Sequence, residues 1–401
     1  MAGVTVTRGL AGRRARRNGS ATTRAARVTK PAPPGGFYAL AALVAVLDIV
    51  GLAMVLSASS VHDLRVFHSA WYSFAHQLLY VIAGTLALIV AAKVDYRRWR
   101  RWAKPMLGVC LVLMLAVLVP GVGVRVSGSA RWLGAGPFQF QPSEITKLAL
   151  VFFCADVLCR RVNRMNDGLY AMGPVLAAFG ACAVLVMAQP DMGTTLVMAT
   201  IVLGGLYVGG APLLSMAGIL GTGFAGGFLL GVAEPYRRAR MLSFLHPLAD
   251  KSNAGYQSVQ GLVALGSGGL TGVGLGASRA KWGFLPNAHT DFIFAIIGDE
   301  LGLLGSLLVV GLFAAFAVLG IRAAVRAPDR FGALVAAGIT AWIVGQAVIN
   351  IGAVIGLLPV TGVPLPFVSY GGSSLVIAMG AVGVLLNVAR QAPTTRRPGQ
   401  P

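Results

Sequence analysis

The sequence has few charged residues, and few of those are acidic. Of its 401 residues 11% are charged and 56% are hydrophobic, whereas soluble domains carry roughly 25% charged residues. This shortage of charge excludes a soluble globular protein, and the apolar excess excludes disorder of the whole chain. With 33 basic against 13 acidic residues the net charge is +20. Only the placement of the basic residues can show whether they serve nucleic acid or a membrane.

Cysteine is scarce as well. The four cysteines lie in or beside apolar stretches, without a Cys-x-x-Cys pair and without a histidine at ligand spacing. This pattern argues against a disulfide framework or a zinc site and predicts free thiols in lipid-embedded helices. The glycine-rich run 266–276 lacks the Gly-Lys-Ser/Thr of a phosphate-binding loop. A flexible linker and a mobile lid are equally good interpretations of it.

Long apolar runs dominate the chain instead. A bilayer core needs about 20 apolar residues per helix, so we predict an all-α, polytopic membrane protein with ten transmembrane helices. The ten stretches are 37–58, 76–92, 105–121, 142–158, 171–188, 191–209, 212–233, 291–318, 330–357 and 373–390. The connection 234–290 is far longer than the others and includes a short interfacial helix over 254–265.

Basic residues are distributed unevenly between the two faces. Ten spans put both termini on one side, and twenty-three of the 33 Lys and Arg residues lie there, against nine on the other side. The termini are therefore predicted to be cytoplasmic and the loop 234–290 extracytoplasmic, so the net charge reports topology. We expect a disordered basic cytoplasmic tail over 1–36, a membrane domain over 37–390 and a short cytoplasmic tail over 391–401.

One carboxylate lies at the outer start of the eighth span. Asp291, in the run His-Thr-Asp-Phe, could accept a proton from a sugar hydroxyl, since partial burial would raise its pKa toward neutrality. Asp is also a favoured helix N-cap, as is the preceding Thr290. The pattern alone leaves catalysis and capping both open.

Arginine also occurs on the outer face, where the topology should make it rare. Arg237, Arg238 and Arg240 directly follow the seventh span. Arg131 and Trp132 precede the fourth span, which begins at residue 142. Guanidinium groups bind phosphate oxygens bidentately, so these arginines could hold a lipid pyrophosphate. Unselective headgroup contact is the alternative, and Trp132 alone is typical of an interfacial anchor.

Two further features concern helix starts near the outer face. Glu144 and Lys147 are spaced i, i+3 in the fourth span, which predicts an ion pair on one helix face that we interpret as structural. The uncharged loop 358–374 is too apolar for a solvated loop and ends at the tenth span. The free N–H groups at that helix start could bind an anion.

Together these motifs resemble the SEDS family, which includes FtsW, RodA and SpoVE. The matching motifs, in the family's order, are Arg131-Trp132-Leu133, Gln141-Pro142-Ser143-Glu144 with Lys147, Gln189-Pro190-Asp191 with Gly193-Thr194, His289-Thr290-Asp291-Phe292, and the run 359–374. The resemblance covers about 37–390. The segment 274–282 is closer to the division branch of the family than to RodA.

The resemblance implies a glycosyltransferase that polymerises lipid II into glycan strands at the outer face of the bacterial plasma membrane, during septal cell-wall synthesis. Asp291 matches the family's essential acidic residue, the proposed catalytic base. The residues expected to bind substrate are Arg131, Trp132, Arg237, Arg238, Arg240, Lys281, Ser369, Gly371, Gly372 and Ser373.

The same resemblance implies a class B penicillin-binding transpeptidase as partner, with other divisome membrane proteins, and no nucleic acid. The family is compatible with a divalent cation, Mg²⁺ or Mn²⁺, although no ligand set in the sequence specifies one. The alternatives are a lipid II flippase and a scaffold that only recruits the transpeptidase. Because the polar motifs concentrate on the outer face, a chemical step there is favoured over transport.

Overall fold

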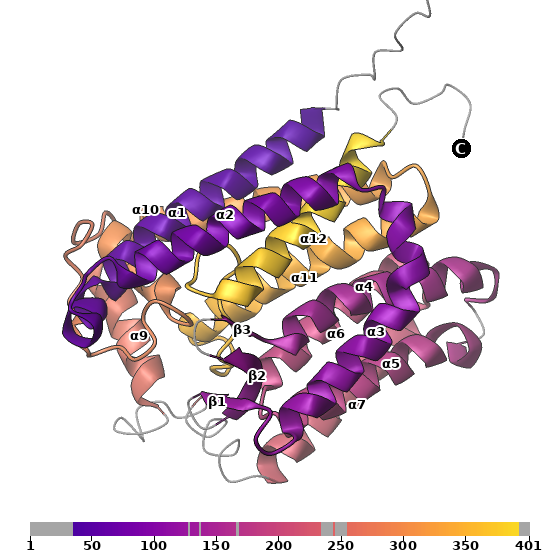
Figure 1. Ribbon diagram of the computed structural model, residues 1–401, viewed down its shortest axis with the longest axis horizontal. Helices are drawn as coiled ribbons and strands as arrows, with labels where there is room; N and C mark the ends of the chain where they lie inside the picture. The colour runs from indigo at the N-terminus through magenta and orange to yellow at the C-terminus, as the bar shows by residue number, and fades with distance from the viewer. Residues whose placement is uncertain are drawn as a thin grey trace, which may run out of the picture. The chain divides into compact units, whose positions relative to one another are not determined.

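The structure is a computed structural model that describes residues 35–126, 129–135, 138–165, 168–233, 244 and 255–392. Its regular structure is almost entirely helical (Figure 1). The helices are α1 (Gly35–Phe67), α2 (Tyr72–Lys93), α3 (Tyr96–Leu118), α4 (Pro142–Arg161), α5 (Gly168–Ala188), α6 (Met192–Gly209), α7 (Leu213–Ala233), α9 (Tyr256–Ser267), α10 (Ile293–Val325), α11 (Arg330–Val354) and α12 (Gly372–Arg390), with short 3₁₀ turns η1 (Val162–Arg164) and η2 (Ala280–Trp282).

Eight helices in the described part of the chain are long and apolar enough to cross a membrane. They are α1, α2, α3, α5, α6, α10, α11 and α12, so the chain is a multi-pass membrane protein. Helix α4 covers the predicted span 142–158 but carries five charged residues. Helix α7 covers the predicted span 212–233, but it is not among the eight because only Leu213–Gly223 counts as an apolar helix there, and this stretch is shorter than the others. The number of ten crossings stays a prediction.

A small antiparallel sheet lies between α3 and α4, which the all-α prediction missed. Its strands are β1 (Val124–Val126), β2 (Ser129–Ala135) and β3 (Phe138–Phe140), in the order β1-β2-β3. Val124 pairs with Trp132, and Leu133 pairs with Phe140. Strands of three to seven residues are too short to show a reliable alternation in the sequence.

Helix α11 lies at the centre of the bundle. It packs against α4, α6 and α10, and 72% of its most apolar window is buried, compared with 17% for α2. Small residues allow these close approaches: a Cβ on Gly338 would lie 3.0 Å from Val151 of α4, and one on Gly345 would lie 2.6 Å from the hydroxyl of Thr200 in α6. Such packing replaces the hydrophobic driving force that is missing between helices in lipid.

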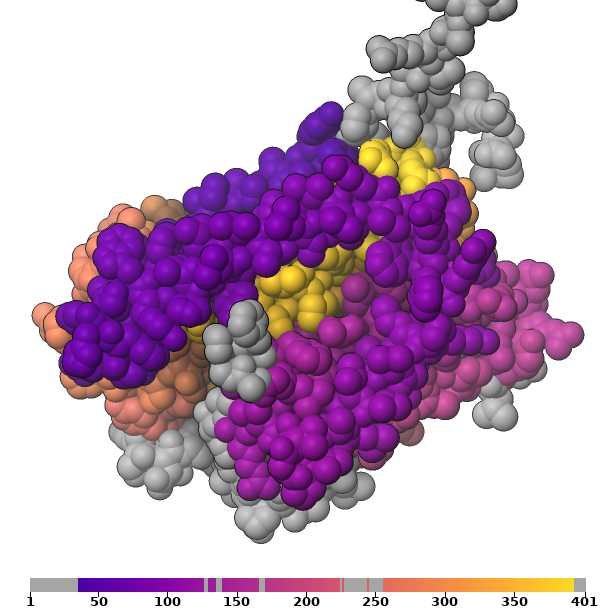
Figure 2. Space-filling view, in the orientation of Figure 1, coloured from indigo at the N-terminus to yellow at the C-terminus, as the bar shows by residue number. Residues whose placement is uncertain are grey.

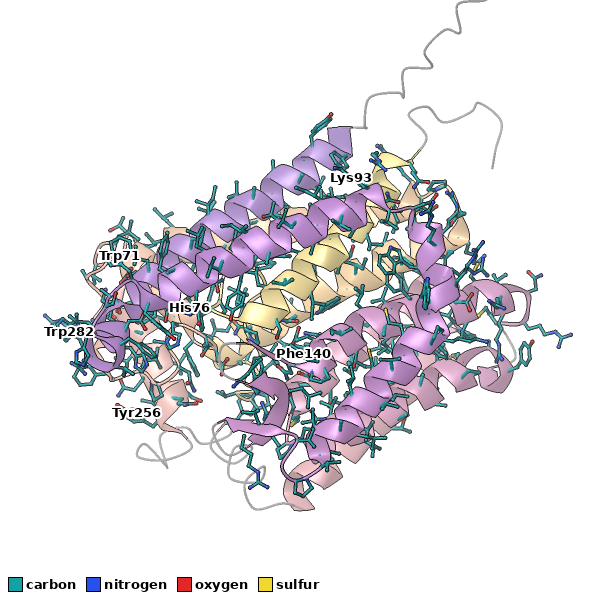
Figure 3. The ribbon with its side chains drawn as sticks, viewed as in Figure 1. Trp71, His76, Lys93, Phe140, Tyr256 and Trp282 are labelled. Atoms are coloured by element: carbon teal, nitrogen blue, oxygen red, sulfur yellow. The ribbon has the colours of Figure 1, made fainter. Side chains whose placement is uncertain are left out.

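The two ends of the bundle differ in chemistry. At one end the basic start of α3 makes polar contacts: Arg97 donates to Asp329 (2.7 Å) and Gln391 (2.8 Å), and Arg100 donates to Asp156 (2.7 Å). Figure 3 shows Lys93 at this end of α2, far from the labelled aromatic side chains at the helix's other end. The other end holds the sheet, α9 and the start of α12 (Figure 1).

Helix α10 is broken at Gly302, which has φ 67° and ψ −163°. Glycine adopts such angles without a steric penalty from Cβ. The break divides α10 into a short first half, 293–301, and a long second half, 303–325. Residues 292–300 are all buried, whereas the second half exposes Leu303, Leu304, Leu307 and Leu308. Protein therefore encloses the first half, while the second half has a face available to lipid.

Candidate active site

Asp291 precedes the buried first half of α10. The helix begins at Ile293 and its N-cap residue is Phe292, so neither Asp291 nor Thr290 occupies the capping position that the sequence allowed them. The Asp291 side chain is half-buried. The uncharged loop 358–371, which leads into α12, is called the last loop. A Cβ added to Gly362 in this loop would lie 3.5 Å from Asp291 Oδ2. The carboxylate therefore lies against the uncharged loop that the sequence singled out.

The main chain that carries Asp291 is fixed by three donors. The carbonyl oxygens of residues 289–291 accept, in order, from Tyr370 N–H (2.9 Å), the Ser369 hydroxyl (2.6 Å) and the Asn350 amide (2.8 Å). The same Asn350 amide donates to Val363 O (2.7 Å). Helix α11 and the last loop thus hold three consecutive peptide units before α10. These bonds fix the main chain from which the Asp291 side chain projects.

Two aromatic rings flank this turn. His289 stacks on His62 with ring centroids 5.6 Å apart and meets the Tyr370 ring edge-on at 5.7 Å. Burial lowers the pKa of His289, and the charge of His62 adds to that effect. Burial, together with neighbouring ionisable groups, raises the pKa of Tyr370 to about 12. Both rings are therefore neutral at pH 7.

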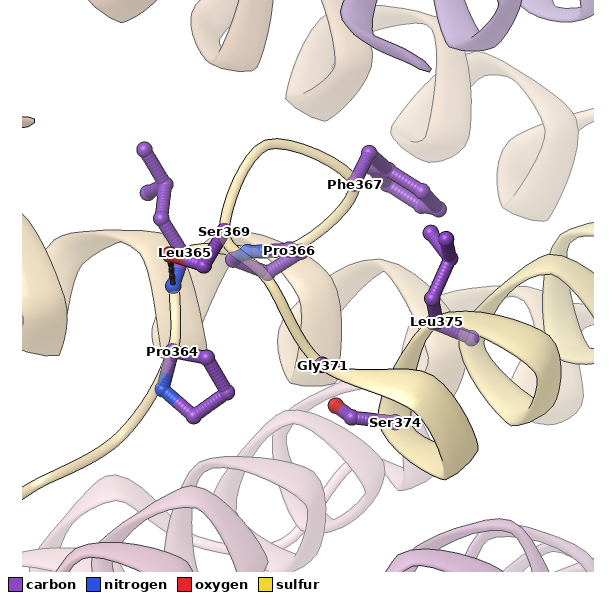
Figure 4. Close-up of a pocket in the computed structure, with 9 residues that line it drawn as sticks. Pro364, Leu365, Pro366, Phe367, Ser369, Gly371, Ser374 and Leu375 are labelled. Carbon is purple, nitrogen blue, oxygen red and sulfur yellow. Dashed lines mark hydrogen bonds between the residues drawn. The ribbon is translucent and has the colours of Figure 1, made fainter. Parts of the chain in front are cut away.

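The last loop is joined to the start of α12 through α2. Gln77 donates to Ser369 O (3.2 Å) and accepts from Gly371 N–H (3.4 Å). A Cβ on Gly372 would lie 2.5 Å from the ring of Tyr80, so α12 starts in direct contact with α2. Figure 4 shows the small pocket formed here by residues 364–378, with the Ser369 hydroxyl accepting from Leu365 N–H (2.8 Å).

Arg131 organises a second helix start. Its guanidinium donates to Gln189 O (3.0 Å) and to Pro190 O, and lies 3.9 Å from the carboxylate of Asp191, with 26% of the side chain exposed. Asp191 caps α6 by accepting from Thr194 N–H (3.0 Å). Arg131 therefore holds the turn before α6 while part of its charge remains accessible.

The starts of α4, α6 and α12 meet at one place. Gln141, just before α4, donates from its side chain to Asp191 (3.2 Å) and from its main chain to Ser373 Oγ (3.4 Å). A Cβ on Gly193 in α6 would lie 2.8 Å from Thr361 O in the last loop. Three positive helix ends thus adjoin the loop that contacts Asp291, an arrangement that favours an anion. Figure 2 shows a hollow on this side of the molecule, with α2 along one wall and α12 at its floor.

The predicted Glu144–Lys147 ion pair is present. The carboxylate and ammonium are 2.8 Å apart, with side-chain exposures of 4% and 1%. Lys147 also donates to Gln346 (3.0 Å) in α11 and lies 5.0 Å from the Trp342 ring centroid. Gln346 in turn donates to Pro364 O (2.9 Å). The pair therefore joins α4 to α11 and, through Gln346, to the last loop.

The remaining predicted site residues lie in other surroundings. Lys281 is buried, and its ammonium contacts Glu300 (3.3 Å) and Gly276 O (2.5 Å). Because a paired ammonium in this position has no open face for phosphate, we replace the substrate-binding interpretation of Lys281 with a structural one. Trp132 is half-buried in β2. The three arginines at 237, 238 and 240 lie outside the described residues.

Sequence reasoning missed three amide side chains, those of Gln77, Gln346 and Asn350. Each is a buried amide in a mostly apolar helix, Gln77 in α2 and the other two in α11, and that contrast was the available signal. Within the described ranges no three His, Cys, Asp or Glu residues are grouped to hold a metal ion. The described residues therefore show no cluster of three such ligands for a divalent cation.

Comparison with known proteins places this geometry in context. The family model for FtsW, RodA and SpoVE, described as cell cycle protein, matches residues 38–394. Stage V sporulation protein E of Bacillus subtilis is 43% identical over 344 residues, which cover 85% of this chain and 93% of the relative. The probable peptidoglycan glycosyltransferase FtsW of Geobacter metallireducens is 39% identical over 355 residues, covering 88% and 93%.

A solved structure also resembles the chain. It is described as "Structural coordination of polymerization and crosslinking by a peptidoglycan synthase complex", and the TM-score to one of its chains is 0.73 at 28% sequence identity. The match covers 89% of this chain and 98% of that chain. The helical arrangement is therefore that of a known membrane fold along nearly its whole length.

Proposed function

The chain belongs to the FtsW/RodA/SpoVE family, and we infer from this membership that it is a peptidoglycan glycosyltransferase. We propose that it polymerises lipid II into glycan strands at the outer face of the plasma membrane. The observation that carries the proposal is the position of Asp291. Its main chain is clamped from α11 and the last loop, and its carboxylate lies against Gly362 beside three helix starts.

In the proposed reaction Asp291 acts as general base. The carboxylate accepts the proton of the acceptor's sugar hydroxyl, and the resulting oxygen nucleophile attacks the anomeric carbon of the donor sugar. The bond from that carbon to the lipid pyrophosphate breaks, and the pyrophosphate leaves with the bonding electrons. The starts of α4, α6 and α12 and the accessible part of Arg131 would stabilise the negative charge on the leaving group.

The finer topology and the partners are also proposals. We propose ten crossings with both termini in the cytoplasm, because the basic connections cluster on one predicted face. A class B penicillin-binding transpeptidase is the proposed partner, supported by the synthase complex whose description pairs polymerisation with crosslinking. A place at the division septum is supported by the family's description as cell cycle protein and by relatives named FtsW.

The test is Asp291→Asn in the purified full-length protein with its transpeptidase. The amide keeps the size of the side chain but cannot accept the proton, so we expect glycan synthesis from lipid II to fall about 10²- to 10⁴-fold. Lipid II binding and thermal stability should stay unchanged. Asp95→Asn is the matched control, because Asp95 caps α3 at the opposite end of the bundle and Asn also caps helices.

Near-normal polymerisation by Asp291→Asn would refute the base assignment. An inactive wild-type protein that nevertheless moves lipid II between the leaflets of a vesicle would favour the flippase. An inactive wild-type protein that only binds the transpeptidase would favour the scaffold.

A further inference from the structure

The first half of α10 joins Asp291 to the break at Gly302, so the contacts that hold this half-helix act on the position of Asp291 together with the hydrogen bonds to residues 289–291. It spans nine residues, 293–301, or about 13 Å at 1.5 Å per residue. A small tilt at one end of so short a rod displaces the other end by a similar distance. How this half-helix is held therefore bears on the placement of Asp291, and a positioning role for its contacts rests on the proposed role of Asp291 as base.

A strap of residues 268–281 closes the break. A broken helix leaves N–H and C=O groups that must find partners elsewhere when buried. Here the strap supplies them through four main-chain hydrogen bonds: Val273 N–H to Asp299 O (3.0 Å), Gly274 N–H to Glu300 O (3.0 Å), Leu303 N–H to Gly269 O (2.9 Å) and Leu304 N–H to Leu270 O (3.2 Å).

The contact between strap and half-helix has no spare room. A Cβ on Gly268 would overlap the carbonyl of Gly298, and one on Gly272 would overlap that of Glu300. At the other end of the half-helix, α9 approaches so closely that a Cβ on Gly261 would lie 3.0 Å from the Phe292 ring. The segment 261–281 therefore touches the half-helix at both of its ends, including the residue next to Asp291.

Two buried carboxylates hold the strap in register. Asp299 accepts from the hydroxyls of Ser267 (2.7 Å) and Ser278 (2.6 Å), one before and one within the strap. Glu300 accepts from Ser57 of α1 (2.6 Å) and pairs with Lys281 (3.3 Å) at the strap's far end. Lys281 also donates to Ser57 (3.4 Å), so the pair joins the half-helix, α1 and the strap to one another.

We propose that Lys281 and Glu300 are positioning residues for the glycosyl transfer: their buried ion pair fixes the strap and α1 against the half-helix and thereby aims the Asp291 carboxylate at the last loop. Neither residue touches the reacting groups. Their effect passes along the half-helix, whose start is already bonded through residues 289–291 to α11 and the last loop.

The experiment compares three variants of the full-length protein with its transpeptidase. Removing one charge alone would leave the other buried and unpaired, which by itself destabilises a protein. The informative variant is therefore the neutral pair Lys281→Met with Glu300→Gln, which keeps the shapes and removes both charges. Arg279→Met is the matched control, because Arg279 is exposed and lies two residues away. Asp291→Asn provides the reference for loss of the base.

We expect the neutral pair to keep wild-type abundance, melting temperature and KM for lipid II, and to lose about 10- to 100-fold in kcat, since a misplacement of about 1 Å can cost 10²-fold. Arg279→Met should match the wild type. A role in folding alone would lower abundance and melting temperature without changing kcat per folded molecule.

A neutral pair with wild-type kcat, beside an inactive Asp291→Asn, would overturn the positioning role and leave the proposed function intact. So would a loss of activity that only follows a loss of folded protein. If instead Asp291→Asn retains full activity, the proposed base is wrong, and the positioning role built on it falls as well.

Discussion

Single residues stabilise this protein through the ion pairs and hydrogen bonds that they make with their neighbours. Lys147 is buried and has one carboxylate partner, Glu144, with Gln346 and Trp342 as its other contacts. Glu144→Gln would leave that ammonium without a counter-charge, at a cost of roughly 3–5 kcal/mol. We predict a low yield of membrane-inserted Glu144→Gln protein by immunoblot, and a recovered yield when Lys147→Met is added.

One result would contradict a structural role for Glu144. If Glu144→Gln is as abundant and as thermally stable as the wild type but does not polymerise lipid II, the pair belongs to the catalytic groups.

Two adjacent glycines allow a matched comparison at the start of α12. A Cβ on Gly372 would meet three ring atoms of Tyr80 at 2.5–2.8 Å, whereas one on Gly371 would meet only Ser374, at 3.8 Å. Gly371 has φ −176°, which any residue adopts. We predict that Gly372→Ala lowers stability by about 1–3 kcal/mol and that Gly371→Ala changes it little, measured by thermal unfolding in detergent.

A second substitution tests the cause of the Gly372 effect. Tyr80→Ala should remove most of the cost of Gly372→Ala, because the overlapping ring is gone. If Gly371→Ala and Gly372→Ala lower the stability equally, flexibility at this turn matters more than the contact with the Tyr80 ring.

At the scale of elements, the start of α11 responds to pH. Asp329 caps this helix through Gly332 N–H (2.7 Å) and accepts from Tyr96 (2.7 Å) and Arg97 (2.7 Å). Burial alone would raise the pKa of Asp329, but these hydrogen bonds and the charge of Arg97 outweigh it and lower the pKa. The stabilisation is therefore complete above the unfolded value, near 3.9, and is lost as the pH falls through the lower folded value.

Asp329→Asn keeps the cap but removes this titration. We expect the wild type to melt at a higher temperature than Asp329→Asn by a constant margin between pH 5 and 7. The margin should shrink below about pH 4. A margin that widens as the pH falls would mean that the carboxylate is destabilised in the folded protein.

The elements also differ in how readily the sequence predicts them. Apolar runs predicted the membrane-spanning helices because lipid demands a long, uninterrupted stretch of such residues. The break in α10 was missed, since Gly302 sits in an apolar run where glycine is common and its φ value depends on the strap. The partner of Lys281 was missed for a similar reason: Ser57, Lys281 and Glu300 meet only after folding. Asp291 could be singled out because a carboxylate is rare at the outer start of a span.

At the scale of the whole molecule, the proposed orientation predicts which surfaces reagents can reach. Thr271 in the strap and Arg98 in the first turn of α3 are both exposed and lie on opposite predicted faces. In a protein whose four native cysteines are replaced, Thr271→Cys should react with a membrane-impermeant maleimide in intact cells. Arg98→Cys should react only after permeabilisation. The reverse pattern would invert the topology.

The bond between Ser57 and Glu300 joins residues 243 positions apart in the chain, which bears on biosynthesis. At about 5–20 residues per second, a ribosome needs roughly 10 to 50 seconds to reach Glu300 after Ser57 has emerged. During that time helix α1 is in the bilayer without its contact to the first half of α10. Assembly of the bundle therefore cannot proceed strictly from the N-terminus, and the earliest span is completed by one of the last to be made.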